Sequence, residues 1–380
     1  MSTIPLELVE RERALRDLLA RFESEAIVGI DTEAASFHRY RDRVYLLQLS
    51  SRTTTAIVDP LGTGGLGPIG PWLGSGRTEF VFHDADYDLR LLRLEYGFEV
   101  ARLFDTRIAA QFLNEPSVGL GALLESRFGV KTDKRFQRAD WSLRPLEADM
   151  LEYAATDTHF LLPLRDQFHD ELVRIGRLAW VQEEFELLTK VEWSEPDSPD
   201  EGFLRMKGAR RLDRRGLAVL RELHQWREAT ASRLDRAQFR VLGNDSILHL
   251  AGSRPTTMSA LEQVPGIGRE TVARRGAELL DAIGRGLQVP EADLPAFPRP
   301  PRMRPDPAFD VRLEQLKAWR VGLAERIGLP VGLVAPNTLL EGVARRTPHS
   351  LEELTTVPGI RRWQVGEFGA ELLGVVARGP

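Results

Sequence analysis

The sequence predicts an α/β domain, a mixed sheet flanked by helices, followed by two small all-helical domains. Short β-branched runs crowd into the first 83 residues, and helical apolar spacing dominates from there to about residue 191. Two later segments repeat each other at a constant offset, and a proline-rich stretch separates them. We therefore expect domains at 1–193, 203–289 and 308–380, with a stiff linker at 290–307.

Four runs rich in β-branched and aromatic residues predict the strands of the sheet. They are residues 26–31, 44–50, 55–59 and 79–83. Residues 6–22 have helical apolar spacing, which predicts a helix before the first strand. Strands that come first, with a long helical region after them, are typical of a mixed sheet with helices packed against it.

The composition excludes several classes of protein. The chain has 51 Lys and Arg against 56 Asp and Glu, a net charge of −5, which argues against a histone-like or coat-like nucleic-acid binder. It has no cysteine, which excludes disulfides, thiolate zinc sites and a cysteine nucleophile. Met1–Glu10 lacks the pattern of a signal peptide, and no apolar run approaches the roughly 20 residues of a membrane span. We expect a cytoplasmic protein with no membrane partner.

Five features of the first helical segment recur 93 residues later in the second. They are Trp226 and Trp319, Arg233 and Arg326, Asn244 and Asn337, the VPGI runs at 264–267 and 357–360, and the GAELL strings that start at Gly276 and Gly369. A constant, ungapped offset of this kind indicates a duplication. We interpret the two tryptophans as core residues, because a small helical domain usually needs a large aromatic side chain in its core.

Two carboxylates close the first predicted strand. Asp31 and Glu33 are two residues apart, so they point to the same face of the sheet. Neighbouring carboxylates repel each other, and a hard divalent cation removes that cost because it prefers oxygen ligands. The alternative is an acidic strand end that turns into solvent.

A tyrosine and an aspartate share one face of a later helix. Tyr153 and Asp157 are four residues apart, about one helical turn. Ala154 and Ala155 are small enough to let this helix lie close to a sheet. The alternative is an ordinary exposed helix surface.

Three acidic residues mark the start of the helix after the fourth strand. Asp84, Asp86 and Asp88 fall within five residues, more than a helix N-terminus needs. The alternative is that they only favour the helix dipole. Spacing alone does not say which of them turns inward.

These motifs, in this order, resemble those of the DEDD superfamily of exonucleases. The sequence has Asp31-x-Glu33, then His83-x-Ala85-x-x-Asp88, then Tyr153-x-x-x-Asp157, the variant with tyrosine in the third motif. The string ADWSLRPL at 139–146 is similar to the ribonuclease D group in particular. The resemblance covers residues from about 5 to 190 and implies a ribonuclease H-like exonuclease fold.

The resemblance implies a site and an activity. It assigns Asp31, Glu33, Asp88 and Asp157 as ligands of two divalent cations, Mg²⁺ or Mn²⁺, and Tyr153 as the residue that positions the attacking water. It implies 3′→5′ hydrolysis of RNA from a free 3′-hydroxyl to 5′-mononucleotides. The expected substrates are tRNA precursors or other structured RNA with a 3′ tail, and we favour a monomer.

One position departs from the family pattern. Ala34 follows Glu33 where many members have phenylalanine, and the first aromatic residue after it is Phe37. We interpret His83 and His159 as packing residues near the site, since the carboxylates already complete the ligand set.

A basic loop lies between the second and third motifs. Residues 131–144 contain five basic and two acidic side chains. Lys131, Lys134, Arg135 and Arg138 are candidates for contacts with a phosphate backbone. The alternative is a solvated loop.

The two repeated segments resemble HRDC domains, which occur in ribonuclease D-type nucleases. Residues 203–240 hold eleven Lys and Arg against four Asp and Glu, an excess that suits phosphate contacts but also an ordinary solvated face. The glycines of the VPGIG run at 264–268 leave backbone N–H groups accessible to a phosphate at a helix start. Arg361 replaces the second glycine in the other copy, which weakens that role there.

Three other readings of the sequence stay open at this point. The same carboxylates would serve a 3′→5′ DNA exonuclease of repair or proofreading type, although the tandem HRDC-like segments and the ADWSLRPL string favour RNA. The second is a nucleic-acid-binding protein with an inactive exonuclease fold. The third is an α/β protein with no nucleic-acid role, in which three acidic motifs fall in this order by chance.

Overall fold

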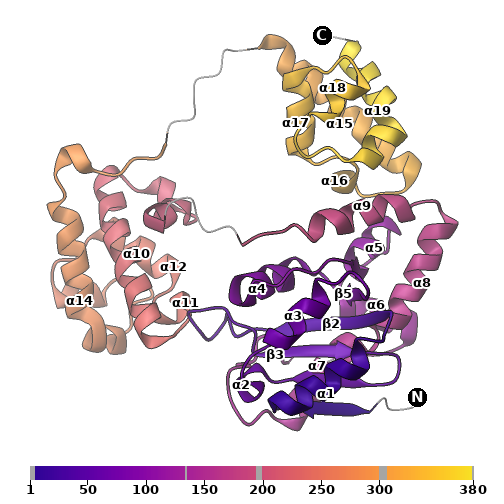
Figure 1. Ribbon diagram of the computed structural model, residues 1–380. Helices are drawn as coiled ribbons and strands as arrows, with labels where there is room; N and C mark the ends of the chain where they lie inside the picture. The colour runs from indigo at the N-terminus through magenta and orange to yellow at the C-terminus, as the bar shows by residue number, and fades with distance from the viewer. Residues whose placement is uncertain (1–4, 133–134, 194–198, 299–305, 379–380) are drawn as a thin grey trace.

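The N-terminal part of the chain forms a six-stranded mixed sheet (Figure 1). The computed structural model describes residues 5–132, 135–193, 199–298 and 306–378. The strands are β1 (Leu6–Val9), β2 (Ile27–Glu33), β3 (Leu46–Ser50), β4 (Thr55–Val58), β5 (Glu79–Phe82) and β6 (Leu103–Asp105). Their order across the sheet is β1-β4-β3-β2-β5-β6, and β3 alone runs antiparallel to its neighbours. The predicted mixed sheet is confirmed, with β2 near its centre.

Two of these strands were not predicted. The helix expected over residues 6–22 is wrong at its start, because Leu6–Val9 is an edge strand parallel to β4 and the helix begins only at Glu12. The other strand, β6, lies inside the region expected to be helical. Both are stretches of three or four residues, which are too short for a period of 2 to be distinguished from helical spacing.

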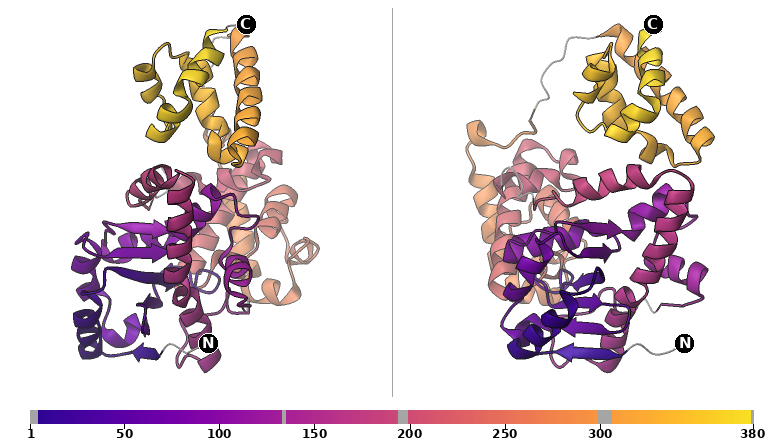
Figure 2. Two further views of the ribbon diagram at one scale, coloured as in Figure 1. Left: turned by 90° about the vertical axis from the view of Figure 1, so that its right-hand side faces the viewer. Right: turned by 45° about the vertical axis from the view of Figure 1, so that its right-hand side comes forward.

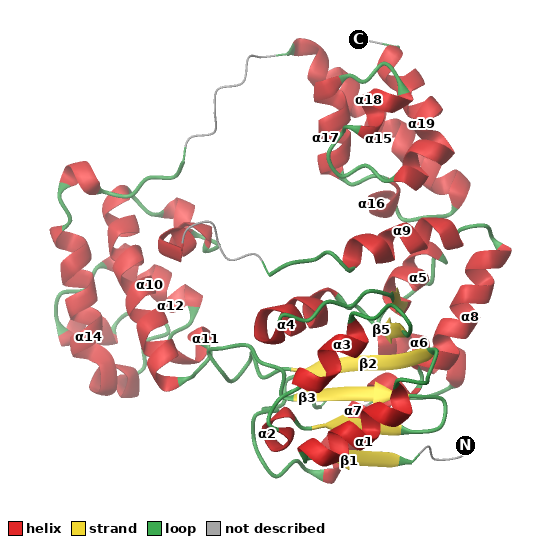
Figure 3. Cartoon of the chain, in the orientation of Figure 1, coloured by secondary structure: helices red, strands yellow, loops and turns green. Residues whose placement is uncertain are grey.

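Helices cover both faces of the sheet (Figures 2 and 3). They are α1 (Glu12–Phe22), α2 (Pro60–Thr63), α3 (Gly70–Leu73), α4 (Asp86–Tyr96), α5 (Thr106–Phe112), α6 (Leu120–Phe128), α7 (Ala148–His159), α8 (Leu161–Arg174) and α9 (Leu178–Leu188). Helix α7 packs across β2, β3 and β4. In the core, Trp72 lies edge-on against Phe80 of β5, with ring centroids 4.8 Å apart.

A close approach between β2 and the junction of α7 and α8 depends on Gly29. A Cβ atom built there would lie 3.0 Å from the carbonyl oxygen of Thr158 and 3.1 Å from Leu162 Cδ1. The buried hydroxyl of Thr158 also lies 2.8 Å from that of Ser50 on β3, which ties the helix to the sheet. The absence of a side chain at Gly29 therefore brings α7 down onto the strand that carries Asp31.

The remaining chain forms two helical units with matching elements. The first contains α10 (Arg214–Leu234), α11 (Gln238–Val241), α12 (Asn244–Ser253), α13 (Met258–Glu262) and α14 (Arg269–Gln288). The second contains α15 (Pro307–Ile327), α16 (Val331–Val334), α17 (Asn337–Arg346), α18 (Leu351–Thr355) and α19 (Arg362–Ala377). Each helix of the second unit begins 93 residues after its counterpart, as the duplication predicts.

The duplicated side chains also make equivalent contacts. Arg227 Nη1 donates to Asn244 Oδ1 at 2.7 Å, and the matching bond from Arg320 to Asn337 is 2.9 Å. Trp226 and Trp319 are partly buried and pack against the cores of their units. Their interpretation as core residues therefore holds, at the margin of each core.

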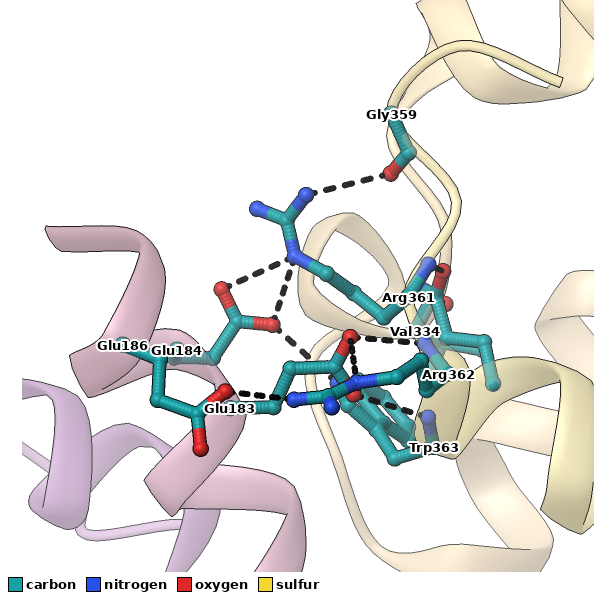
Figure 4. A network of polar contacts seen from close by, with 9 residues as sticks. Glu183, Glu184, Glu186, Val334, Gly359, Arg361, Arg362 and Trp363 are labelled. Carbon is teal, nitrogen blue, oxygen red and sulfur yellow. Dashed lines mark hydrogen bonds and ion pairs between the residues drawn. The ribbon is translucent and has the colours of Figure 1, made fainter. Parts of the chain in front are cut away.

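The second helical unit docks on α9 through a network of polar contacts (Figure 4). The carboxylate of Glu183 accepts the backbone N–H groups of Arg362 and Trp363, at 2.7 and 2.9 Å. Glu183 thereby caps the N-terminus of α19 from another part of the chain. Beside it, the indole of Trp363 stacks on that of Trp180, with centroids 4.9 Å apart and ring planes 14° apart.

The first helical unit meets the loop that follows β2. The backbone N–H of Ala237 donates to the carbonyl of His38 at 3.2 Å, and the N–H of Tyr40 donates to Asp235 at 3.2 Å. The hydroxyl of Tyr40 donates to Glu228 at 3.2 Å. In the part of the chain that the structure describes, no helix is long and apolar enough to cross a membrane.

Candidate active site

Strand β2 ends with two of the predicted carboxylates. Asp31 and Glu33 lie on the same face, and both are partly buried. They meet Asp157 of α7, and one carboxylate oxygen from each of the three residues lies within 4.8 Å of the others. Carboxylates from distant parts of the chain therefore form one cluster.

Helix α7 is placed by its small residues. Ala154 and Thr158 are fully buried against the sheet, whereas Tyr153 and Asp157 on the neighbouring face are partly exposed. The hydroxyl of Tyr153 lies near the carboxylate of Asp157, and burial together with that negative charge raises the pKa of the tyrosine. The helical spacing seen in the sequence thus brings the hydroxyl next to the carboxylate cluster.

Asp88 is the acidic residue of the second motif that turns inward. It lies in the first turn of α4, is 6% exposed, and accepts a short hydrogen bond from the hydroxyl of Thr32. Asp84 instead forms an ion pair with Arg107, and Asp86 pairs with Arg90 at 2.7 Å. The two other acids are therefore neutralised at the surface.

Burial raises the pKa of all four carboxyl groups, and at Asp31 and Glu33 the charges of neighbouring carboxylates raise it further. Burial, together with the charges of Asp88, Asp157 and Glu33, holds the pKa of Asp31 well above its usual range. Burial and the charges of Asp157 and Asp88 do the same to the pKa of Glu33. Burial raises the pKa of Asp88 to about 7 and that of Asp157 to about 7. This much uncompensated negative charge is costly unless cations balance it.

The donor set suits hard divalent cations. Within the described residues, none of Asp31, Glu33, Asp88 and Asp157 forms an ion pair with lysine, arginine or histidine. All the clustered side-chain donors are carboxylate oxygens, the ligands that Mg²⁺ and Mn²⁺ prefer. The residues present therefore fit a divalent metal site.

Tyr153 keeps its proton. Burial and the charges of Asp157, Glu33 and Asp31 raise the pKa of its hydroxyl far above the usual value of 10. Its ring stacks on Trp141, with centroids 6.1 Å apart, which fixes the orientation of the hydroxyl. A protonated hydroxyl held in place can donate a hydrogen bond and cannot act as a base near neutral pH.

A cavity of about 370 Å³ opens beside these groups. Asp31, Tyr153 and Asp157 line it together with His83 and Gln137. Burial, and then the charge of Arg107, lower the pKa of His83 to about 4, so the imidazole is neutral at pH 7. Its Nδ1 lies 2.9 Å from the hydroxyl of Thr106, which agrees with a packing role.

The basic loop borders the same region. Lys131 and Arg135 line a second cavity that also includes Tyr153 and Asp157. Arg138 lies over the ring of Phe37, with its guanidinium carbon 5.1 Å from the ring centroid. Lys134 lies outside the described residues.

Some contributors to the site region were not found from the sequence. Gln137 lines the cavity but carries no motif signal, and its position follows only from the path of the loop. Phe37 was noted as a displaced aromatic residue, and the structure places its ring against Phe239 of the first helical unit, 6.2 Å between centroids. That contact joins residues about 200 positions apart, which local patterns do not report.

Comparisons with known proteins first identify the classes of domain that the chain contains. The family model for 3′-5′ exonucleases matches residues 6–173, and the model for HRDC domains matches residues 216–283 and 310–376. A crystal structure of a protein from Bifidobacterium adolescentis is similar over 98% of this chain and 97% of that one, with a TM-score of 0.83 and 25% identity. The chain thus combines an exonuclease domain with two HRDC domains.

The comparisons also define the family. The ribonuclease D of Granulibacter bethesdensis is 31% identical over 373 residues, which cover 97% of this chain and 92% of that protein. The crystal structure of Escherichia coli RNase D has the same fold, with a TM-score of 0.72 over 98% of this chain and 99% of that one at 23% identity. The chain belongs to the ribonuclease D family of 3′-5′ exoribonucleases.

Proposed function

We propose that Asp31, Glu33, Asp88 and Asp157 hold two divalent cations, Mg²⁺ or Mn²⁺, and that Tyr153 positions the attacking water. The observation that carries this proposal is the convergence of carboxylates from β2, α4 and α7 with no basic side chain of the described chain to neutralise them. Such a cluster is stable near neutral pH only when cations share it.

The cations would supply the electrostatic part of the reaction. When bound, they would lower the pKa of a coordinated water and stabilise the charge that develops on the leaving 3′-oxygen. The protein itself contributes placement. Thr32 holds Asp88 toward the cluster, and the close contact at Gly29 holds Asp157 beside Asp31. Displacing either carboxylate would leave the donor set incomplete.

Tyr153 would act by position and not by proton transfer. Its hydroxyl stays protonated, adjoins Asp157 and faces the same cavity as Asp31. A fixed hydroxyl at that place can hold a water in line with the phosphorus atom. Orientation of a reactant contributes a substantial part of many rate enhancements.

We further propose that the substrates are structured RNAs with a free 3′ tail, tRNA precursors among them. The Escherichia coli protein with this fold is described as an exoribonuclease involved in structured RNA processing. The two helical units would bind the folded body of the RNA while the 3′ end occupies the carboxylate site. We assign 1–193 to hydrolysis and 203–289 and 308–380 to this second task.

The experiment is metal-dependent release of 5′-mononucleotides from RNA with a 3′-hydroxyl end. Asp31→Ala should abolish release while leaving the fold intact. Tyr153→Phe should lower kcat by roughly a hundredfold with KM nearly unchanged, because the ring stays in place and only the hydroxyl is lost. Asp84→Asn is the matched control, since that acid pairs with Arg107 at the surface, asparagine tolerates its positive φ of 67°, and the change should leave kcat unaltered.

Metal-dependent release by Asp31→Ala would contradict the ligand assignment. An unchanged kcat in Tyr153→Phe would remove that residue from the mechanism. A second arm compares RNA and DNA strands of the same sequence, and faster release from DNA would overturn the choice of substrate.

A further inference from the structure

Three exposed aromatic side chains gather around the loop that follows β2. Among the described residues, the large aromatic side chains that are exposed are Phe37, Tyr87 and Phe239, at 40%, 40% and 52% exposure. Phe37 belongs to the loop itself, and the hydroxyl of Tyr87 lies near Asp42 of the same loop, so that burial together with the charge of Asp42 raises the pKa of the tyrosine. Apolar surface gathered at one place on a folded protein commonly marks a binding site.

Two arginines complete a cluster on this surface. The rings of Phe37 and Phe239 are 6.2 Å apart and nearly perpendicular, at 73°. The guanidinium of Arg138 lies 5.1 Å from the centroid of Phe37, and that of Arg240 lies 5.9 Å from the centroid of Phe239. We call these four residues the aromatic–arginine cluster. Its members come from the exonuclease domain and from α11 of the first helical unit.

The cluster is held by backbone contacts on both sides. The carbonyl of His38 accepts the N–H of Ala237, and the ring Nε2 of His38 lies 2.8 Å from the carbonyl of Arg138. Arg240 Nε donates to the carbonyl of Phe37 at 2.5 Å. The loop, the basic segment and α11 are therefore joined at the cluster, so its side chains are ordered before any ligand arrives.

The charge of the cluster is available to a ligand. Arg138 and Arg240 are exposed, and neither forms an ion pair with a carboxylate in the described ranges of the chain. The nearby acids Asp235 and Glu228 are already engaged, because each accepts a hydrogen bond from the loop after β2. Aromatic faces beside unneutralised arginines are the combination that binds single-stranded nucleic acid, by stacking on bases and attracting phosphates.

The cluster is continuous with the carboxylate site. Phe37 follows Glu33 by four residues, which an extended chain spans in at most about 14 Å. On the other side, Arg138 directly follows Gln137, which lines the cavity that contains Asp31. A strand whose 3′ end occupies the carboxylate site therefore reaches the cluster within a few nucleotides.

We propose that the aromatic–arginine cluster is a stacking platform for bases of the single-stranded 3′ tail, upstream of the nucleotide being removed. This rests on the proposed function, because it places the 3′ end of an RNA at the carboxylate site. Since Phe239 belongs to α11, the first helical unit contributes directly to the path of the tail.

The test is steady-state kinetics of the full chain with Mg²⁺ on two substrates. One is a hairpin RNA with a single-stranded 3′ tail of about ten nucleotides, and the other is a dinucleotide too short to reach the platform. Phe239→Ala should raise KM about tenfold on the tailed hairpin, the loss of one stacked base, with kcat unchanged. The dinucleotide should be hydrolysed as by the wild-type chain.

Rescue and control variants separate stacking from simple packing. Phe239→Trp should restore KM, whereas Phe239→Leu should not, because leucine fills space but offers no ring face. Met258→Ala removes a side chain of the same unit that is 44% exposed, and it should leave KM unchanged.

An unchanged KM in Phe239→Ala, full rescue by leucine, or an equal defect on the dinucleotide would each overturn the platform. If the wild-type chain releases nucleotides and Phe239→Ala has the same KM, the platform is rejected and the proposed function stands. Failure of the wild-type chain to release nucleotides would reject both.

Discussion

Removing the carboxylate of Glu183 should loosen the second helical unit from the exonuclease domain. Glu183 is 8% exposed and is hydrogen-bonded to the N–H groups of Arg362 and Trp363 at the start of α19. In Glu183→Ala both donors lose their acceptor at a buried interface. The neighbouring stack of Trp180 on Trp363 would remain, so docking should weaken and not disappear.

The size of the effect follows from these contacts. A hydrogen bond to a charged group contributes about 1.5–3 kcal/mol, and an unsatisfied buried donor costs a similar amount. The helix dipole adds to the attraction for a negative charge at that end. Because the two bonds share one carboxylate and are not additive, we expect Glu183→Ala to lower the free energy of docking by about 3–5 kcal/mol.

Glu186→Ala is the matched control on the same helix. Its ion pair with Arg362 joins side chains that are 61% and 74% exposed, where solvent screens the attraction and the pair contributes little. The assay is urea unfolding followed by tryptophan fluorescence, with the radius of gyration measured by X-ray scattering below the transition. Glu183→Ala should show an earlier transition and a larger radius, and Glu186→Ala should match the wild-type chain.

Equal effects of the two substitutions would refute the reasoning, because they would show that general surface charge holds the interface. An unchanged radius and transition in Glu183→Ala would refute it as well. In that case the apolar contacts around Trp363 would suffice for docking.

Two further predictions concern the carboxylate site. Without metal, the folded chain holds the pKa of Asp88 at about 7 against an ordinary 3.8, so its neutral form stabilises the fold at low pH and that stability is lost as pH rises through 7. At about 1.4 kcal/mol per unit the full loss is roughly 4 kcal/mol, and it accumulates between about pH 4 and pH 7. The melting temperature in EDTA should therefore fall across that range, and saturating Mg²⁺ should remove the loss. A melting temperature that does not change with pH in EDTA would contradict the prediction. Gly29→Ala should lower both kcat and stability, the latter by about 1–3 kcal/mol, because a Cβ there meets Thr158 at 3.0 Å and pushes α7 outward. Gly284→Ala, where a Cβ meets nothing within 4 Å, should show neither effect in the same unfolding and rate measurements.

Much of the candidate site could be predicted because each motif lies within one element. The spacing of two in a strand places Asp31 and Glu33 on one face, and the spacing of four in a helix does the same for Tyr153 and Asp157. Periodicity could not show that the two pairs meet. Their meeting depends on the crossing of α7 over β2, and the family resemblance supplied that expectation.

The choice among the acids of the second motif shows where local patterns stop. Asp86 has Arg90 one helical turn later, so its surface ion pair could have been read from the sequence. Asp84 pairs with Arg107 of α5, and no spacing in the sequence near Asp84 indicates that partner. Burial of Asp88 then follows from the bond to Thr32, a residue 56 positions earlier.

The contacts between domains could not be predicted, because they join residues far apart in the sequence. Glu183 and Trp363 are 180 positions apart, and nothing around Glu183 distinguishes it from Glu184 or Glu186 on the same helix. The short strands β1 and β6 were missed for a different reason. Their extended conformation depends on pairing with neighbouring strands of the sheet, and their own residue composition does not specify it.

The two helical units share the turn before α14 and α19, but they differ in what binds the backbone N–H groups that follow it. Gly266 and Gly359 have nearly the same backbone angle, with φ of 82° and 86°, so the turn before α14 and α19 is shared. In the second copy the N–H groups after that turn are taken by Glu183, an anion supplied by the chain itself. Among the described residues, α14 receives no side-chain cap at its N-terminus. At the start of α19 the N–H groups that a phosphate would need are already bonded to Glu183, so a phosphate contact at this turn stays a prediction for the first copy alone.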